Sequence, residues 1–108
     1  MKIYSTTKAR CETRAHVLKA LAHPIRLFMI EQLAEKSYCV NDLTEMVGLD
    51  VSTVSKHLSI LKNAGLVAVE KKGKQVYHSL RMRCALNFLD CVEAVLKEQV
   101  KDRMDAIQ

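Results

Sequence analysis

The chain has 108 residues, 49% hydrophobic and 27% charged, and therefore predicts one small domain with a modest core. Lys and Arg number 17 against 12 Asp and Glu, and the resulting net charge of +5 favours a polyanionic partner. Three glycines and one proline argue against an all-β sandwich, and no apolar run reaches the roughly 18 residues of a membrane span. The polar, basic N-terminus lacks the pattern of a signal peptide, so we expect a cytoplasmic protein with reduced cysteines and no membrane partner.

The first half of the chain predicts a flexible N-terminal arm over residues 1–10 and then three helices. Helical spacing of apolar residues begins at Cys11 and marks the first helix. Pro24 starts the second helix, because proline is well tolerated in a first helical turn. The third helix is short, about residues 40–47, and ends at Gly48, which can adopt the left-handed conformation that closes helices. We treat residues 11–108 as one domain for DNA binding and dimerisation.

A fourth helix follows Asp50, a good N-cap residue, and carries Val54, Leu58 and Leu61 at helical spacing. Two short helices joined by a glycine turn predict a helix-turn-helix, whose second helix fits the major groove of B-DNA. Small hydroxyls and cations lie on the face opposite the apolar residues, where they can approach phosphates and base edges. The candidate DNA contacts on this helix are Ser52, Thr53, Ser55, Lys56 and Lys62, with His57 nearer the boundary of the face.

Two strands rich in Val and Tyr come next, about residues 66–70 and 75–80. A hairpin turn joins them, with Gly73 supplying the positive φ. Three further candidate contacts lie at the tip of this hairpin, where they can touch a phosphate backbone or reach the minor groove: Lys71, Lys72 and Lys74. The order of cap, polar helix face, glycine stop and basic hairpin predicts a winged helix-turn-helix that binds double-stranded DNA.

The last helix, from about Met82 to the end, carries two adjacent apolar stripes. Two stripes are too wide for a lone surface helix on a small domain, so one covers the core and the other calls for a partner, most simply a second copy. The alternative is a wide intramolecular core. A two-fold dimer would place two reading helices about 34 Å apart and would bind an inverted repeat. The predicted fold is mainly α with a two-stranded β-wing, in the order α-α-α-α-β-β-α, dimerising through its first and last helices.

The stretch from about Val17 to Leu96 resembles the ArsR/SmtB winged-helix repressors, bacterial sensors of metals, metalloids and sometimes redox signals. Residues 18–27 resemble the family's opening signature, residues 51–61 its recognition helix and residues 72–80 its wing. The resemblance implies a homodimer that represses transcription at an operator and releases DNA when an inducer binds. It also implies that bases are read mainly from Val51, Ser52, Ser55 and Lys56, with Thr53 and His57 nearby.

The family's metal sites are incomplete in this chain. A family stretch of the form Cys-x-Cys-Asp-Leu corresponds to residues 39–43, in which Cys39 matches and Asn41 replaces the second cysteine. The zinc set that the family carries on its last helix is broken, because the matching residues here are Met82, Cys84, Val95 and Glu98. A tetrahedral zinc site of that type is therefore not expected.

Cys39 lies where Ser or Thr would normally cap the third helix, and cysteine caps poorly, unless Asn41 is the true cap. A helix N-terminus favours the thiolate, which makes such a thiol reactive and a good ligand for soft ions. Cys11, near the N-terminal arm, is the candidate second ligand, from the same or the other subunit. Thiolates favour arsenite-type metalloids, Cd, Hg or Cu(I), and no metal is expected to be needed for folding.

Cys84 and Cys91 rank behind as metal ligands, because seven residues separate them by about 10.5 Å along one helix and both are typical small core residues. The leading interpretation is a homodimeric repressor released by a thiophilic metal or metalloid such as arsenite or Cd. One alternative is a repressor that responds to thiol oxidation or polysulfide, in which Cys39 and Cys11, or a pair that includes Cys84, form a disulfide. Another is a ligand-independent regulator with structural cysteines. An enzyme is disfavoured, since no nucleophile–base motif or Gly-rich phosphate loop is present.

Overall fold

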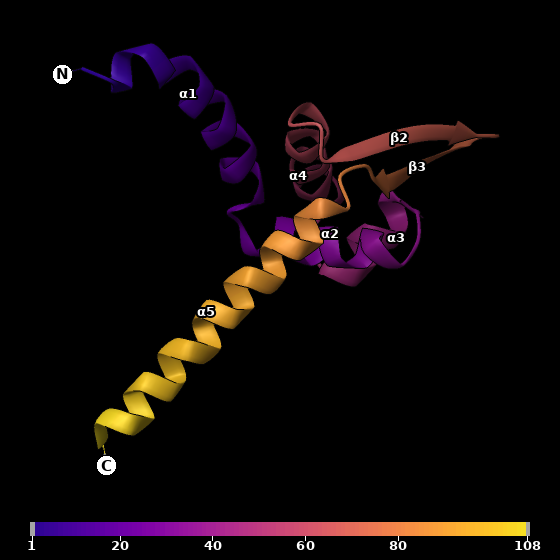
Figure 1. Cartoon of the computed structure of the whole chain (residues 1–108). Coiled ribbons are helices and arrows are strands. Elements are labelled where there is room, and N and C mark those ends of the chain that lie inside the picture. Colours follow the sequence, from indigo (N-terminus) through magenta and orange to yellow (C-terminus); the bar gives the residue numbers. More distant parts are fainter. Residues whose placement is uncertain (1, 108) are drawn as a thin grey trace.

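The structure, a computed structural model, describes residues 2–107; Met1 of the predicted arm and Gln108 of the predicted domain lie outside the described residues. Its elements are α1 (Tyr4–Leu21), α2 (Pro24–Glu35), β1 (Tyr38–Cys39), α3 (Val40–Val47), α4 (Val51–Asn63), β2 (Val67–Lys72), β3 (Gln75–Leu80) and α5 (Cys84–Ile107). Figure 1 shows α2, α3, α4 and the sheet gathered in one body, which α1 and α5 leave in different directions. The predicted winged helix-turn-helix is confirmed.

The helices of the body begin and end at residues that cap their free backbone N–H and C=O groups. Pro24 occupies the first turn of α2, and the Nδ1 atom of His23 accepts a hydrogen bond from the Ile25 amide at 3.1 Å. Gly48 closes α3 with a φ of 80°, a conformation that costs other residues free energy. Asp50 caps α4 by accepting from the Thr53 amide at 3.2 Å. These caps set the turn between α3 and α4.

The core lies where the faces of the helices meet the sheet. Val54, Leu58 and Leu61 are buried on α4, as their spacing predicted. The other buried residues come from every further helix, from both long strands and from the turn before β2: Ala20, Leu21, Met29, Ile30, Leu33, Leu43, Leu66, Val67, Leu80 and Ala85. Arg83 adds a directional link, because its guanidinium donates to the Ala34 carbonyl at 3.2 Å near the C-terminus of α2.

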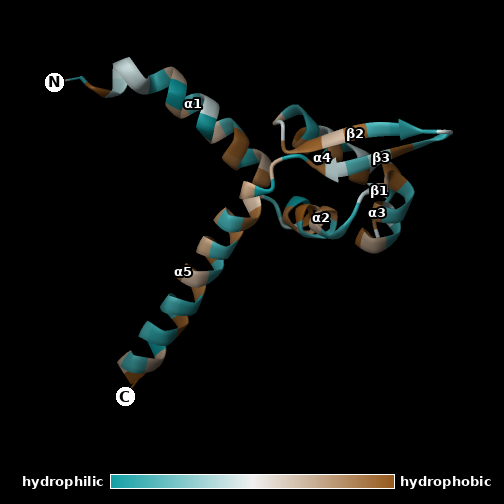
Figure 2. Cartoon of the chain, turned by 45° about the vertical axis from the view of Figure 1, so that its right-hand side comes forward, coloured by the Kyte–Doolittle hydropathy of each residue, from teal (hydrophilic) through white to brown (hydrophobic). Residues whose placement is uncertain are grey.

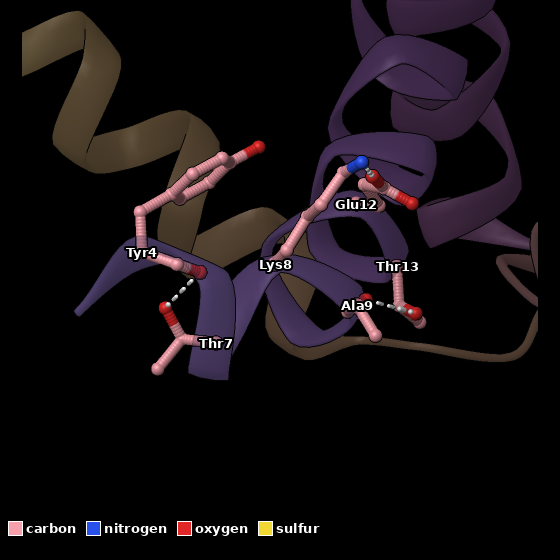
Figure 3. A network of polar contacts seen from close by, with 6 residues as sticks. All are labelled: Tyr4, Thr7, Lys8, Ala9, Glu12 and Thr13. Carbon is pink, nitrogen blue, oxygen red and sulfur yellow. Dashed lines mark hydrogen bonds and ion pairs between the residues drawn. The ribbon is translucent and has the colours of Figure 1, made fainter. Parts of the chain in front are cut away.

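Helix α1 begins at Tyr4, so residues 4–10, for which we predicted a flexible arm, are helical. No glycine or proline interrupts residues 2–22, and polarity alone does not break a helix. Figure 3 shows the contacts within its first turns: the Thr7 hydroxyl donates to the Tyr4 carbonyl at 3.3 Å, and Lys8 pairs with Glu12 at 3.6 Å. All of these contacts are local to the helix, and the ion pair is exposed and therefore weak.

The sheet has three strands in the order β1-β3-β2, one more than predicted. Residues 38 and 39, predicted as part of a connection, pair with β3 as Tyr38↔His78 and Cys39↔Tyr77. Strand β2 continues to Lys72, so the turn at the tip is shorter than the four residues predicted. Gly73 has a φ of 63° and the next residue has a negative φ, the pattern of a type II′ hairpin turn.

Helices α1 and α5 give the chain an extended shape. The radius of gyration is 17.4 Å, whereas a compact domain of this length has about 13 Å. Among the described residues of α5, Ala85 alone is fully buried. Figure 2 shows hydrophobic positions repeated along the whole of α5, which starts beside the end of α1 and then runs out from the body. None of the described helices is long and apolar enough to span a bilayer.

Candidate DNA-binding surface and cysteine sites

The outward face of α4 forms one stripe of polar side chains. Ser52, Lys56, Ser59 and Asn63 follow one another at helical spacing and are all exposed. They lie opposite the buried face of the helix. Ser59 and Asn63 were not among the predicted contacts, although the positions i+7 and i+11 from Ser52 would have identified them. Val51, a predicted base contact at the first position of the helix, is 49% exposed.

The hydroxyls at the N-terminus of α4 are already engaged within the chain. The Ser52 hydroxyl and the Thr53 hydroxyl both donate to the carboxylate of Asp50, the second at 2.6 Å. These hydrogen bonds lower the pKa of Asp50 to about 2, so its carboxylate is charged at neutral pH. A hydroxyl that donates to a carboxylate keeps only its acceptor lone pairs free. Ser52 and Thr53 are therefore presented to solvent as acceptors, beside a negative charge.

The wing lysines do not share one face of the hairpin. Lys71 is paired with Val76, so the two side chains share one face of the hairpin, and Val76 faces α4. Lys72 lies on the opposite face, with its ammonium group 5.9 Å from the centre of the Tyr77 ring. Lys74 is the second residue of the turn. A run of lysines in the sequence is thus divided by the two-residue period of the strand.

A groove separates α4 from the wing, with a volume of about 280 Å³. Its walls carry two hydroxyls and a cation from α4 and apolar residues from the sheet. The lining residues are Ser55, Ser59, Lys62, Leu58, Val40, Val69, Val76 and His78. The predicted contacts Ser55 and Lys62 therefore meet the wing at this groove, which joins the helix and the hairpin into one surface.

His78 closes the floor of this groove from β3, the position on a wing strand that we predicted. Burial lowers the pKa of His78, and the charge of Lys62 acts in the same direction, while a hydrogen bond with the Tyr38 backbone opposes both. Its buried Nδ1 atom has no hydrogen-bond partner among the described residues. The imidazole is thus held mostly neutral next to a lysine of the candidate DNA surface.

His57, another candidate contact, faces the body of the domain instead of solvent. Its Nδ1 atom lies 3.1 Å from a guanidinium nitrogen of Arg26, and its ring centre lies 4.4 Å from that of His23. Burial lowers the pKa of His57, and the neighbouring charges of His23 and Arg26 lower it further. Lys56, one residue earlier, is on the outward stripe. Consecutive residues of a helix lie about 100° apart around its axis, so Lys56 faces outward while His57 turns toward α2.

Cys39 occupies the N-cap position of α3 and makes no capping hydrogen bond with its side chain. Asn41 lies inside the helix, so it is not the cap. The Cys39 thiol instead donates to a carboxylate oxygen of Asp42 at 3.2 Å. The side chain is half-buried, and its backbone is part of β1. A thiol and a carboxylate are thus adjacent at the start of α3, close to the wing sheet.

The other cysteines do not gather around Cys39. Cys11 is exposed on α1, which Figures 1 and 2 show running away from α3 toward its N-terminus. Cys84 and Cys91 are both exposed on α5, so the expectation that they pack as core residues within one chain is wrong. Within residues 2–107, no three side chains of His, Cys, Asp or Glu lie together as a metal site. One chain therefore supplies at most part of such a site.

Comparison with known proteins agrees with this geometry. The profile of the family described as "Bacterial regulatory protein, arsR family" matches residues 23–69, which span α2 to the start of β2. An HTH-type transcriptional regulator of Mycobacterium tuberculosis is 31% identical over 96 residues, which cover 88% of this chain and 84% of the relative. The chain belongs to the ArsR family. It is accordingly a DNA-binding transcriptional repressor built on a winged helix-turn-helix, and not an enzyme.

Two further relatives cover most of this ArsR-family chain. The biofilm growth-associated repressor of Xylella fastidiosa is 28% identical over 92 residues, 85% of this chain and 81% of the relative. The solution structure of a homodimeric winged helix-turn-helix DNA-binding domain from Mycobacterium bovis superposes with a TM-score of 0.75. The two sequences are 28% identical, and the superposition covers 85% of each chain. These likenesses extend beyond the helix-turn-helix to most of the chain.

Proposed function

We propose that this repressor acts as a homodimer that binds an inverted-repeat operator, and that it releases the operator when a thiophilic metal or metalloid binds thiolates that include Cys39. The observation that most supports the dimer is the apolar surface of α5 beyond Leu89, which is exposed throughout the described part of the helix. The outward stripe of α4 and the wing support DNA binding. The placement of Cys39 supports the inducer site.

The apolar residues of α5 call for a partner helix. Beyond Leu89 the helix is exposed throughout, and Val95 and Leu96 are 57% and 50% exposed. The exposed apolar residues of α5 are Phe88, Val92, Val95, Leu96, Val100, Met104 and Ile107. Such a patch on a soluble regulator marks an interface, and a second copy buries it by symmetry. The homodimeric M. bovis relative supports this choice of partner.

The proposed DNA surface combines α4 with the hairpin. The outward stripe would enter the major groove, with Lys56 and Ser55 closest to base edges, while the wing lysines contact phosphates. The proposed contacts are Val51, Ser52, Thr53, Ser55, Lys56, Lys62, Lys71, Lys72 and Lys74, and the predicted contact His57 is left out because it contacts Arg26 and His23 instead. In a two-fold dimer the two α4 helices would lie about one helical turn apart on the duplex, so the operator would be an inverted repeat.

The proposed inducer site needs ligands from two chains. Cys39 and Asp42 form a pair, but α1 carries Cys11 away from them within the same chain. The second thiolate would come from Cys11 of the other subunit. Binding of a soft ion removes the proton that Cys39 now donates to Asp42 and replaces the hydrogen bond with a bond to the ion. Soft thiolate ligands favour arsenite or Cd(II) over hard cations.

A titration tests the inducer. The reduced protein is bound to a duplex that it has itself selected from a random pool, and arsenite, Cd(II), Zn(II) and a polysulfide are added in separate experiments. We expect release by arsenite or Cd(II), and loss of this response in Cys39→Ser but not in the matched control Cys91→Ser. Release by polysulfide alone, with a disulfide formed, would replace the metal with a redox signal. Release by none of the four reagents would contradict the proposal of a sensing thiol.

A further inference from the structure

Arg26 is the central residue of a polar network that joins three helices. Its Nε atom donates to the Ala20 carbonyl at 2.5 Å, and its Nη2 atom donates to the Lys19 carbonyl at 3.2 Å. Its Nη1 atom lies 3.1 Å from Nδ1 of His57 on α4. One guanidinium on α2 therefore holds the last turn of α1 and the middle of α4 together.

Each contact in the network fits the chemistry of its partner. The carbonyls in the last turn of a helix carry partial negative charge, so a cation is favoured there. Arginine has five N–H donors and no acceptor, so Nδ1 of His57 must be the acceptor in the contact with Arg26. That role requires a neutral imidazole with its proton on Nε2. The geometry therefore fixes both the tautomer and the protonation state of His57.

The ring of His57 also rests on His23, which caps α2. The two ring centres are 4.4 Å apart and the planes are inclined by 45°. Nδ1 of His23 accepts from the Ile25 amide at 3.1 Å, so this ring is fixed in place by its own helix. The charged and titratable groups that face His57 are thus His23 and Arg26 from the α2 side, and α1 presents backbone carbonyls to the network.

We propose that Arg26 and His57 are positioning residues that fix the rotation of the recognition helix α4 relative to α1, so that operator affinity depends on this network. The inference rests on the proposed function, in which α4 binds DNA as part of a homodimer, and on the prediction from the sequence that the first helix, α1, takes part in the dimer with α5. Val54, Leu58 and Leu61 hold α4 by apolar contacts, which are not directional. The hydrogen bond to His57 is directional and adds the angular restraint.

The network links the dimer to the DNA surface. Lys56 and His57 are consecutive on α4, so a rotation of the helix that breaks the contact between His57 and Arg26 also moves Lys56 on the outward stripe. A shift of the α1 C-terminus in the dimer moves the two carbonyls that hold Arg26, and the guanidinium passes that shift to α4. Protonation of His57 would also release α4 from this restraint, because a protonated imidazole has no acceptor for the guanidinium of Arg26.

The experiment compares operator binding by the dimeric full chain at pH 8 and pH 5.5, with a scrambled duplex measured in parallel. For the wild type we expect operator affinity to fall at pH 5.5 relative to the scrambled duplex. Arg26→Gln should lose about tenfold in operator affinity at pH 8, the size expected for one charged hydrogen bond, and should show a smaller pH dependence. Arg26→Lys should fall between the two, because an ammonium can reach the α1 carbonyls without forming the planar fork.

A matched control separates positioning from general acid sensitivity. His16 is exposed on α1, so His16→Asn should keep both the affinity and the pH profile of the wild type. The ¹⁵N shift of His57 Nδ1, measured by NMR, should move in Arg26→Gln if the hydrogen bond exists in solution. Wild-type affinity and an unchanged pH profile in Arg26→Gln would overturn the inference. A wild type that binds no selected duplex would instead overturn the proposed function.

Discussion

Cys39 and Tyr77 are register partners across β1 and β3, so the candidate sensing thiol and the wing belong to one sheet. Strand β3 continues from Tyr77 to Gln75 at the edge of the hairpin turn, and β2 pairs with its other side. We propose that a change at Cys39 reaches the wing lysines through the backbone hydrogen bonds of this sheet.

This coupling predicts a change in hydrogen exchange. When the proposed inducer binds Cys39, the amides of β3 opposite β1 should change their exchange rates, because the backbone of Cys39 is paired there. The measurement is hydrogen–deuterium exchange with and without Cd(II), with Cys39→Ser as the control. Equal exchange across residues 75–80 in both states would show that the signal takes another route.

The two central wing lysines should differ in their effects on DNA binding. Lys71 shares the α4-facing side of the hairpin, whereas Lys72 lies over Tyr77 on the other side. We expect Lys71→Gln to weaken operator binding and to reduce the slope of log affinity against log salt by about 1 for each phosphate that the lysine neutralises. Lys72→Gln should do less. Equal effects would mean that the hairpin twists on binding or touches DNA with both faces.

Asp50 should stabilise α4 through its ionised carboxylate. Its pKa is lowered to about 2 in the folded chain from an ordinary value of 3.8, so this stabilisation is present above pH 3.8 and is lost as the pH falls toward 2. Asp50→Ala should lower the melting temperature at pH 7 and flatten the acid limb of the stability profile. Asp50→Asn keeps a capping oxygen and should lose less. Thermal unfolding by circular dichroism between pH 7 and pH 2 checks both variants.

Substitution on α5 should separate the chains. Leu96 is 50% exposed in the single chain and would be buried against the partner, so Leu96→Glu places a charge in an apolar interface. We expect a folded but largely monomeric protein by analytical ultracentrifugation. Lys97→Gln, one residue along the helix, changes the net charge by the same amount without placing a charge in the apolar stripe, and it should leave the dimer intact. A Leu96→Glu dimer as stable as the wild type would place the interface elsewhere.

The body of the fold was predictable from the sequence because its signals are local. Gly48 and Asp50 mark the turn, and the spacing of Val54, Leu58 and Leu61 marks the buried face of α4. Strand β1 was not predictable, because two residues carry no periodicity and pair only through the tertiary fold. The start of α1 at Tyr4 was missed because the first turns of this helix are fully exposed and carry no apolar stripe that would reveal them.

The candidate site was predictable as a set of residues but not as a surface. The lysine run did not reveal that Lys71 and Lys72 face opposite ways, because this depends on β2 reaching Lys72. His57 was assigned to the DNA face from its place near the boundary of α4, whereas Arg26 and His23 lie some thirty residues earlier in the chain. Whether a residue at the edge of the outward face of α4 points to solvent or to the domain body depends on contacts with distant segments, which the local sequence does not reveal.

The most direct test is the stoichiometry and specificity of DNA binding by the full chain. We predict two chains per inverted-repeat duplex and an operator affinity about 10³-fold or more above that for a scrambled duplex at physiological salt. Lys56→Ala should remove most of this preference while leaving the dimer intact. A monomer, or a dimer that binds both duplexes equally, would contradict the proposal that two outward α4 faces read one operator.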